Sequence, residues 1–373
     1  MGRFMSGLKI LYIFDAVDWN SRMPVALEAR KQGYEVVIGL IGDAQKIKDF
    51  EGFDIRPLSK PSFKPHSISP MKSVKEKRAL MRDVQPDIMH VVPMKYGFLA
   101  GLAAYGLGDF KKIYTLAGLG YLFRSNTKSS AVIRGIIKPM LAHVFRKPCT
   151  HLIFQNSDDL ALMVEKGYAR QERCHLILGS GVHIDKFTSE SEEQDPPIVL
   201  MPTRLVHEKG VSVFVEAARL LKNKGIKANF QIAGGENGNP KAITRAEMLE
   251  MTKDGSVEWL GRVENMPELL AKTSQVVYPS YYGEGIPRVL LEACAAGKAI
   301  VTTNHPGCRE AVRHGENGLL VPVRDVEATA KAIEDILSDP QKRRIMEKNS
   351  RKRAQDDFDI SVIAKQTVAL YKR

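Results

Sequence analysis

Short runs of consecutive apolar residues alternate along the chain with longer segments in which apolar residues recur every three or four positions. In the first half, the apolar runs cover residues 8–14, 34–41, 87–91, 112–116, 151–155 and 174–178. Unbroken apolar runs of this length predict strands buried on both faces, as in a parallel sheet covered by helices. Helical spacing fills the intervals at residues 23–31, 70–84, 96–105 and 158–166. The alternation predicts a doubly wound α/β domain.

The second half repeats this alternation. Strands are predicted at residues 198–201, 229–233, 257–260, 275–279 and 299–302, and helices at 210–221, 266–271, 287–296, 325–337 and 340–355. The polar, acidic segment 189–197 ends in two prolines and is typical of a linker. We therefore expect an α/β protein with two doubly wound Rossmann-like domains, at residues 1–190 and 198–356, facing a cleft. Ligands of such domains bind outside the carboxyl ends of the strands.

One further segment has a regular amphipathic pattern. Its apolar residues recur at helical spacing, and they are Ile133, Ile136, Ile137, Met140, Leu141, Val144 and Phe145. Arg134, Lys138 and His143 fall off that face. Such a helix can pack on a protein core or lie in a membrane interface with its basic residues toward the lipid headgroups. The pattern alone leaves both arrangements open.

Composition narrows the class of protein. Of the 373 residues, 44% are hydrophobic and 26% are charged, which is typical of a globular chain and excludes a disordered or fibrous one. No apolar run approaches the length of a membrane-spanning helix or of a secretory signal. The four cysteines have no C-x-x-C spacing, so we expect buried thiols in a reducing cytoplasm and neither disulfides nor a zinc site.

The positive charge is concentrated in the first half. The net charge is +12, and residues 1–190 contribute +10 of it, from 28 basic and 18 acidic residues. Residues 110–157 contain no acidic residue at all. This excess predicts an anionic partner, either a phosphate-bearing substrate, an acidic lipid surface or a nucleic acid, although a solvated basic face would look the same. No nucleic-acid-binding module is present, so we expect no nucleic acid partner.

Residues 279–303 (PSYYGEGIPRVLLEACAAGKAIVTT) hold the most informative pattern. A strand ends, a loop carries Glu284 and Gly285, and Pro287 occupies a position favoured in the first turn of a helix. The backbone N–H groups of Gly285, Ile286 and the start of the helix would form an anion site suited to a diphosphate. Glu292 lies off the buried stripe of this helix and faces either water or a ligand.

Glu284 and Glu292 form an E-x₇-E pattern that, with the surrounding glycines and proline, resembles the signature of retaining GT-B glycosyltransferases of family 4. The resemblance covers nearly the whole chain and is stronger in the second half. It implies that the last helix, residues 357–373, crosses back to the first domain.

Three other segments resemble this family. Residues 203–210 (TRLVHEKG) place Arg204 and Lys209 where the family stabilises the donor diphosphate. Residues 233–236 (AGGE) contain Gly235 in a glycine-rich loop near the donor, and residues 260–263 (LGRV) place Arg262 and Val263 near the nucleobase. Each of the last two segments is a weak signal by itself.

The resemblance also implies the chemistry. Glu284 would hold and orient the donor sugar, and Glu292 would hydrogen-bond the ribose. The donor would be a UDP-sugar, and front-face attack with retention would need no cofactor and no metal. The one D-x-D pattern, Asp357 to Asp359, is interpreted as structural because it lies near the end of the chain.

The first domain is expected to bind the acceptor. Residues 115–123 (TLAGLGYLF) resemble a loop of bacterial members that add N-acetylhexosamines to polyprenyl-diphosphate-linked glycans, which assigns Gly118, Gly120 and the adjacent Arg124 to the acceptor. Arg22 resembles an arginine of the same subgroup. The family's histidine near this loop and its glycine turn after the first strand are both missing.

These features lead to one leading hypothesis, a cytoplasmic glycosyltransferase peripheral to the inner face of the plasma membrane. Its partners would be a nucleotide-sugar donor, a phosphate-bearing lipid-linked glycan and an anionic membrane surface. A nucleotide-sugar epimerase on a similar pair of domains remains the alternative.

Overall fold

The computed structural model describes residues 7–43, 52–62, 69–119, 128–189, 194–236 and 242–372. They form two compact units, each built around one parallel sheet. The first unit comprises the residues up to Ser180 and those from Ile360 onward, and the second comprises Gly181–Asp359.

A seven-stranded sheet in the order β3-β2-β1-β4-β5-β6-β7 forms the first unit. The strands are β1 (Lys9–Asp15), β2 (Glu35–Ile41), β3 (Asp54–Leu58), β4 (Ile88–Val91), β5 (Lys111–Leu116), β6 (Thr150–Phe154) and β7 (Cys174–Leu176). The helices are α1 (Trp19–Lys31), α2 (Ser69–Val84), α3 (Met94–Ala103), α5 (Lys128–Phe145), α6 (Ser157–Glu165) and α13 (Ile360–Ala369). The strand order reverses between β1 and β4.

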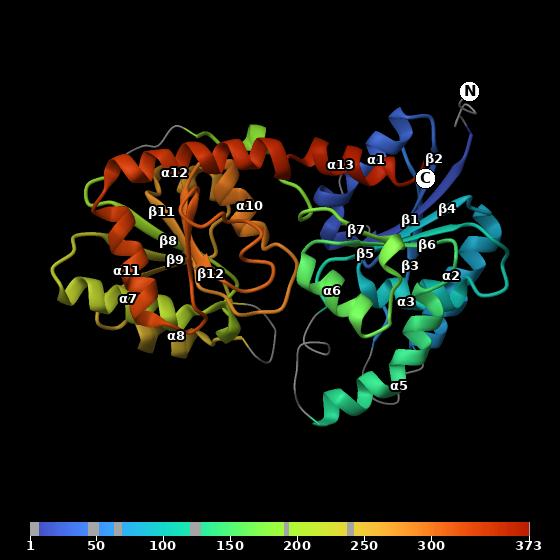
Figure 1. The fold of residues 1–373 in the computed structure, drawn as a ribbon, viewed down its shortest axis with the longest axis horizontal. Helices are drawn as coiled ribbons and strands as arrows, with labels where there is room; N and C mark the ends of the chain where they lie inside the picture. Colours follow the sequence, from blue (N-terminus) through green and yellow to red (C-terminus); the bar gives the residue numbers. More distant parts are fainter. Residues whose placement is uncertain are drawn as a thin grey trace. The chain divides into compact units, whose positions relative to one another are not determined.

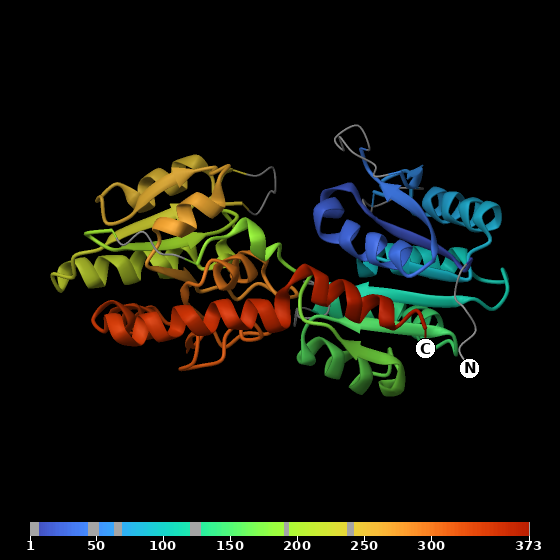
Figure 2. The same cartoon turned by 90° about the horizontal axis from the view of Figure 1, so that it is seen from above.

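Both faces of this sheet are buried. Ile10 and Tyr12 of β1 pack with α1 and α13, whereas Leu11 and Ile13 pack with α2, α3 and α5. Figure 1 shows these helices on opposite sides of the sheet, and Figure 2 shows α13 running beside α1. Successive residues of a strand point to opposite faces, which explains why the buried strands are unbroken apolar runs.

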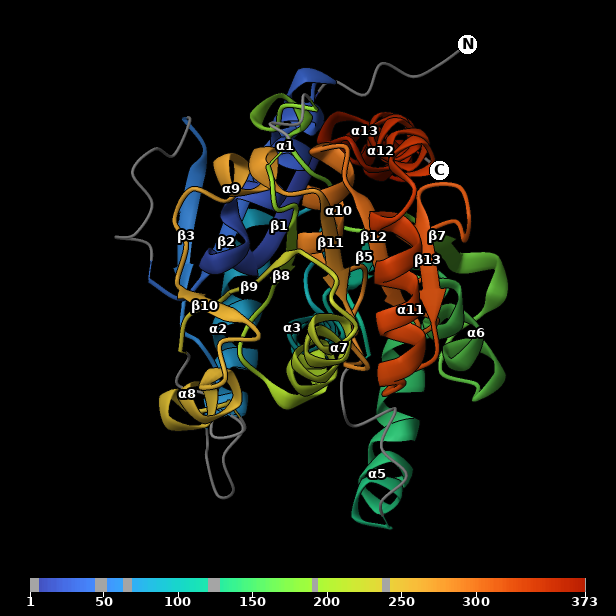
Figure 3. The same cartoon turned by 90° about the vertical axis from the view of Figure 1, so that its left-hand side faces the viewer.

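The second unit has a six-stranded parallel sheet in the order β10-β9-β8-β11-β12-β13. The strands are β8 (Ile198–Pro202), β9 (Asn229–Ala233), β10 (Glu258–Gly261), β11 (Gln275–Tyr278), β12 (Ala299–Thr303) and β13 (Gly318–Val321). The helices are α7 (Val211–Asn223), α8 (Arg245–Thr252), α9 (Met266–Lys272), α10 (Arg288–Ala295), α11 (Val326–Leu337) and α12 (Pro340–Arg353). Figure 3 shows α7 and α10 on opposite sides of this sheet.

The predicted fold class is confirmed: both units are doubly wound α/β domains, and every strand expected from the sequence is present within one or two residues. The strands β3 and β13 and the helix α8 were not predicted. β3 is an edge strand that includes Arg56 and Pro57, so it lacks the apolar run of a central strand.

The units divide earlier in the chain than the linker-like segment 189–197. Val182 already belongs to the second unit, because its N–H donates to the carbonyl of Phe358 at 2.9 Å. The carbonyl of Phe187 likewise accepts a hydrogen bond from Arg351 at 2.9 Å. These contacts tie the segment after Gly181 to the second unit before the polar stretch begins.

The amphipathic segment forms α5, and its carboxyl-terminal half packs on the core. Leu141, Val144 and Phe145 are buried there and Ile137 packs against them, as the pattern indicated. Met140 was placed on the same face by its spacing, but it is 43% exposed because it lies at the edge of the packed stripe.

All four cysteines are free thiols. Cys294 and Cys308 are buried as expected, but Cys149 and Cys174 are only half-buried. The expectation of four buried thiols is therefore wrong for these two, because Cys149 precedes β6 and Cys174 begins the edge strand β7, where the core no longer covers the side chains.

Candidate donor site in the second unit

The order of the second sheet reverses between β8 and β11, and the loops that follow these strands meet at its carboxyl edge. At such a reversal the flanking loops run in opposite directions and leave a crevice between them, where ligands of doubly wound sheets bind. The β8 loop carries Arg204 and Lys209, and the β11 loop carries Glu284. The sequence-predicted catalytic residues therefore come from the two strands that flank the reversal.

Lys209 and Glu284 form an ion pair, with the lysine ammonium donating to Oε1 of the carboxylate. The hydroxyl of Tyr278 donates to the same oxygen at 3.2 Å. Lys209 is only 2% exposed. Burial lowers the pKa of Lys209, the negative charge of Glu284 opposes this shift, and the positive charge of Arg204 adds to it. The lysine and the carboxylate thus depend on each other for charge compensation.

Aromatic rings surround the same ammonium group. The Nζ atom of Lys209 lies 4.6 Å from the ring centroid of Tyr282 and 5.3 Å from that of Tyr278. The two tyrosines restrict access of water and favour a cation at this point. Sequence analysis did not assign either tyrosine; their position at and just after the end of a buried strand is the signal that could have identified them.

Main-chain contacts hold the two loops together. The N–H of Tyr281 donates to the carbonyl of Glu208 at 2.9 Å. Gly210 has φ +80° and lies so close to Pro279 that a Cβ atom would collide with the carbonyl oxygen of that proline. A glycine is required here for both reasons. This close approach brings Lys209 within reach of the β11 loop.

The start of α10 provides the expected backbone groups. Gly285, Ile286 and Pro287 are buried, Pro287 is the N-cap residue, and α10 begins at Arg288. No side chain caps this end of the helix. The first N–H groups of the helix are therefore available for an anion.

Glu292 lies one turn into α10, where its carboxylate accepts a hydrogen bond from Nε of Arg288 at 2.9 Å. Its side chain is 16% exposed. Burial raises the pKa of Glu292, and the charge and hydrogen bond of Arg288 oppose that rise. The carboxylate is thus partly desolvated and already oriented by a neighbour on the same helix.

The remaining predicted donor residues lie on the loops that follow β9 and β10. The N–H of Gly234 donates to the carbonyl of Gly261 at 2.8 Å, and a Cβ atom on Gly235 would lie 2.9 Å from Cβ of Arg262. Arg262 is exposed and Val263 is half-buried. The loop after β9 also lies against the loop after β8, since a Cβ atom on Gly234 would collide with the carbonyl oxygen of Thr203. Four successive loops thus form one continuous edge.

In the first unit, Arg22 is buried in α1, and its Nε has no hydrogen-bond partner among the described residues. Burial raises the pKa of both Tyr12 and Asp18, and the positive charge of Arg22 opposes the rise in each. Gly118 follows β5 with φ +99°. Gly120 and Arg124 lie outside the described residues, so the structure does not place them.

A polar group that sequence analysis did not assign lies at the carboxyl end of β1. Asp15 is 5% exposed, and its Oδ2 accepts hydrogen bonds from the hydroxyl of Tyr96 at 2.8 Å and from Lys60 at 3.1 Å. Burial acts to raise the pKa of Asp15, but these partners outweigh it and hold that pKa below its ordinary value. In the sequence, the signal for this polar group is a single aspartate at the end of an apolar strand.

The D-x-D segment makes contacts within the second unit. Asp357 pairs with Arg353 at 3.1 Å and with Arg313 at 3.7 Å. The described residues contain no group of three or more histidine, cysteine or acidic side chains arranged to hold a metal ion. Among the described helices, none is both long enough and apolar enough to cross a bilayer.

Two doubly wound units, one with a buried lysine paired to a carboxylate at its sheet reversal, define a two-domain α/β protein of the class whose ligands bind at the strand ends. Residues 183–353 match the family described as glycosyl transferases group 1, and residues 9–156 match the family described as glycosyl transferase 4-like. The chain belongs to the GT-B glycosyltransferases of this group.

Similar proteins agree with this assignment. The chain is 29% identical, over 95% of each chain, to an N,N'-diacetylbacillosaminyl-diphospho-undecaprenol alpha-1,3-N-acetylgalactosaminyltransferase of Campylobacter jejuni. It is 24% identical to a UDP-Gal:alpha-D-GlcNAc-diphosphoundecaprenol alpha-1,3-galactosyltransferase of Escherichia coli, over 79% of this chain and 77% of that one.

Solved structures share the fold. The sucrose-phosphate synthase of Thermosynechococcus elongatus superposes with a TM-score of 0.78 at 20% identity, over 98% of each chain. HepE of Anabaena in complex with UDP and glucose superposes with a TM-score of 0.74 at 18% identity, over 98% of this chain and 99% of that one.

Proposed function

We propose that this glycosyltransferase transfers an N-acetylhexosamine from a UDP-sugar, with retention of configuration, to a glycan linked to a polyprenyl diphosphate. The buried pair of Lys209 and Glu284 at the sheet reversal is the observation that carries the donor part of this proposal. The acceptor class rests on the likeness to the Campylobacter and Escherichia transferases, whose names specify undecaprenol-linked acceptors.

Arg204 and Lys209 would stabilise the departing diphosphate. As the bond between the sugar and UDP breaks, negative charge grows on the leaving phosphate oxygen. Two fixed cations and the start of α10 offset this charge without a metal ion. The buried position of Lys209 strengthens its effect, because the surroundings screen its charge less than water does.

The other donor residues would orient the substrate. Glu284 would hydrogen-bond hydroxyls of the sugar, and Glu292 would hydrogen-bond the ribose. Gly235, Arg262 and Val263 would surround the nucleobase and the phosphates. The acceptor hydroxyl would attack the sugar carbon on the face that UDP leaves, and its proton would pass to the leaving phosphate oxygen. No cofactor takes part in this step.

The first unit would bind the acceptor. Residues 1–190, which include most of this unit, carry a net charge of +10, which matches a lipid diphosphate and an anionic membrane surface. Arg22, with its unpartnered Nε, would contact the acceptor phosphate together with Gly118, Gly120 and Arg124. The enzyme would act peripherally at the inner face of the plasma membrane.

A transfer assay tests this proposal. The purified protein is incubated in EDTA with UDP-GalNAc, UDP-GlcNAc or UDP-Gal and a polyprenyl-diphosphate-linked sugar, and the new linkage is assigned by NMR. We expect an α-linked product from a UDP-N-acetylhexosamine. A β-linked product would exclude retention, loss of activity in EDTA would exclude metal independence, and isomerisation of the UDP-sugar without acceptor would favour the epimerase.

A further inference from the structure

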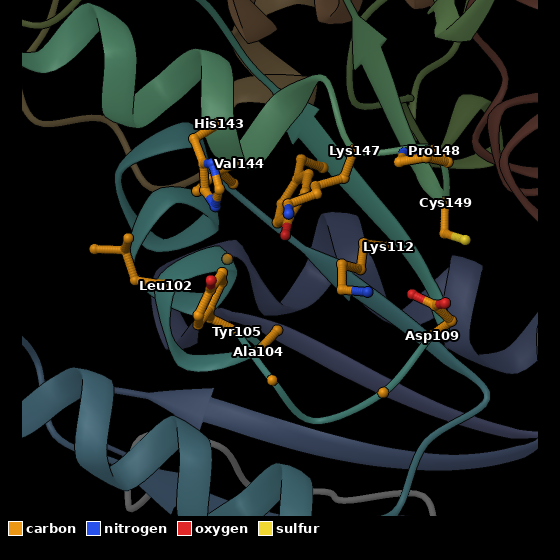
Figure 4. Close-up of a pocket in the computed structure, with 14 residues that line it drawn as sticks. Leu102, Ala104, Tyr105, Asp109, Lys112, His143, Val144, Lys147, Pro148 and Cys149 are labelled. Atoms are coloured by element: carbon orange, nitrogen blue, oxygen red, sulfur yellow. The ribbon is translucent and has the colours of Figure 1, made fainter.

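A cavity of about 260 Å³ opens at the amino-terminal edge of the seven-stranded sheet, where β5 and β6 begin. Its walls come from the end of α3, the turn that follows, the start of β5 and the end of α5 (Figure 4). The chemically active side chains of its lining are Tyr105, Asp109, Lys112, Tyr114, His143 and Lys147. All strands of the sheet are parallel, so this edge lies opposite the one that carries Asp15 and Gly118.

Two lysines bring positive charge to the wall of this cavity. The ammonium group of Lys112 donates to the carbonyl of Phe110 at 2.9 Å and lies 4.0 Å from the centroid of that ring. Burial lowers the pKa of Lys112, the charges of Cys149 and Asp109 oppose this shift, and the charge of Lys147 adds to it. Within the described part of the chain, neither the Lys112 nor the Lys147 ammonium group forms an ion pair with a carboxylate. Asp109, which also lines the cavity, acts on Lys112 without forming an ion pair, so an anionic ligand would give both cations a direct counter-ion.

A buried hydroxyl lies among the lining groups. Tyr114 is 0% exposed, and its hydroxyl has no hydrogen-bond partner in the described part of the chain. The hydroxyl is next to Gly101, where a Cβ atom would lie 3.1 Å from it and would collide with Val144. The glycine thus allows α3 and α5 to pack closely beside this hydroxyl. A buried donor without a partner is costly, so a ligand oxygen at this point would be stabilised.

The rim of the cavity is aromatic. Tyr105 is 64% exposed, and its ring centroid lies 5.6 Å from the Nζ atom of Lys147 and 5.6 Å from the ring of His143. An exposed aromatic ring beside cations suits a ligand with a carbon skeleton next to its anionic group. Pockets for drug-sized molecules span roughly 300–1,000 Å³, so a volume of about 260 Å³ fits a smaller ligand.

We propose that this cavity is a binding site for the phosphate ester of a small polyol. The phosphate group lies between Lys112 and Lys147, the carbon skeleton packs on Tyr105, and a ligand oxygen accepts the hydrogen of the Tyr114 hydroxyl. A soluble sugar or glycerol phosphate and the headgroup of a glycerophospholipid share this chemistry. The site is separate from the donor site, and its assignment does not rest on the function proposed above.

Calorimetric titration of the full chain with sn-glycerol 3-phosphate and with glucose 6-phosphate, in the presence and absence of saturating UDP, tests the site. We expect saturable binding that UDP leaves unchanged. Lys112→Met and Lys147→Met should each weaken it at least tenfold, and Tyr114→Phe should weaken it several-fold. The matched control is Arg146→Met, because Arg146 is a neighbouring exposed cation outside the lining. It should leave the affinity unchanged.

Vesicles of phosphatidylglycerol and of phosphatidylcholine distinguish a soluble phosphate ester from a lipid headgroup as the source of the ligand. If a soluble ester binds, the ligand is a free metabolite. If only phosphatidylglycerol vesicles bind, and this binding is lost in Lys147→Met but kept in Arg146→Met, the ligand is a lipid headgroup. Lys147 is exposed, so its replacement preserves the fold even if a Lys112 variant unfolds. The proposal is overturned if no probe binds, if UDP abolishes binding, or if Arg146→Met loses as much affinity as Lys147→Met.

Discussion

At the scale of single residues, Lys209 of the second unit combines burial with a full positive charge. Its charged group lies against two tyrosine rings and one carboxylate and is nearly closed off from water. Removing one partner of a buried pair leaves the other charge uncompensated, which is much more costly than losing an exposed salt bridge. The effects of substituting Lys209 and Glu284 are therefore coupled.

Lys209→Met and Arg204→Ala should each lower kcat for transfer by about 10²–10³-fold, the scale of one lost electrostatic stabiliser in a transition state. Steady-state kinetics with a UDP-sugar measures the loss. Lys253→Met is the matched control, because Lys253 is an exposed cation of the same unit that pairs only with Glu250 in the described structure. Activity near wild type in both test variants would place the diphosphate elsewhere.

Glu284→Gln should separate binding of UDP from transfer. In this structure the Glu284 carboxylate forms an ion pair with the Lys209 ammonium. The neutral glutamine therefore leaves a buried cation without a counter-charge. We expect a lower Tm without ligand, a larger rise of Tm on adding UDP, and a large loss of transfer, because the sugar is no longer oriented. Thermal unfolding with and without UDP provides the measurement, and a smaller UDP-induced rise than in wild type would contradict this account.

At the scale of elements, α13 is joined to the first sheet by polar contacts as well as by apolar packing. His90 of β4 is buried between two hydroxyl groups. The hydroxyl of Tyr371 lies 2.7 Å from its Nδ1 atom, and the hydroxyl of Thr115 lies 2.8 Å from its Nε2 atom. Lys111 donates to the carbonyl of Leu370 at 2.9 Å. The residues that directly follow α13 are thus held by strands that lie far away in the sequence.

His90 should make the stability of the protein depend on pH. Burial lowers the pKa of His90 from 6.5 to about 3, so between these values only the unfolded state binds the proton. Stability should therefore fall as the pH drops below 6.5, by about 2 kcal/mol at pH 5, since each pH unit contributes about 1.4 kcal/mol. Urea denaturation of wild type and His90→Gln at pH 7 and pH 5 measures this loss, and equal losses in both proteins would refute it.

The elements themselves were largely predictable from local pattern. A central strand such as β1 must be apolar on both faces, which leaves a clear run in the sequence. The short edge strand β3 is mostly exposed and includes Arg56 and Pro57, so its residues have no apolar run to reveal it. The position of Met140 at the edge of the α5 stripe likewise depended on the neighbours of the helix, not on its spacing.

At the scale of the whole molecule, the charge distribution separates the two halves of the chain. Residues 1–190 carry +10 of the net charge of +12. In α5, Lys138 and Met140 are both exposed, and a helix that exposes a cation and an apolar side chain is suited to a lipid interface. The other face of the same half of the helix packs on the core, whereas contact of the exposed face with a membrane stays a prediction.

Binding to anionic vesicles should therefore depend strongly on salt. The Debye length falls from about 10 Å at 0.1 M salt to about 3 Å at 1 M, which screens exposed cations from lipid headgroups. We expect sedimentation of the protein with phosphatidylglycerol vesicles at low salt and release at high salt. Lys138→Ala should weaken the binding, whereas Lys253→Met in the second unit should not. Failure to bind at low salt would refute the membrane interpretation.

The sequence by itself determined the α/β class, the positions of the central strands and the loops that carry Arg204, Lys209 and Glu284, because periodicity and glycine-rich turns are local properties. Only the tertiary structure decided that Tyr278 and Tyr282 enclose Lys209, that Asp15 joins Tyr96 and Lys60, and that Tyr114 lies beside a cavity with Lys112 and Lys147. These groups come from different strands and helices, and their distances depend on strand order and packing, which no single stretch of sequence encodes.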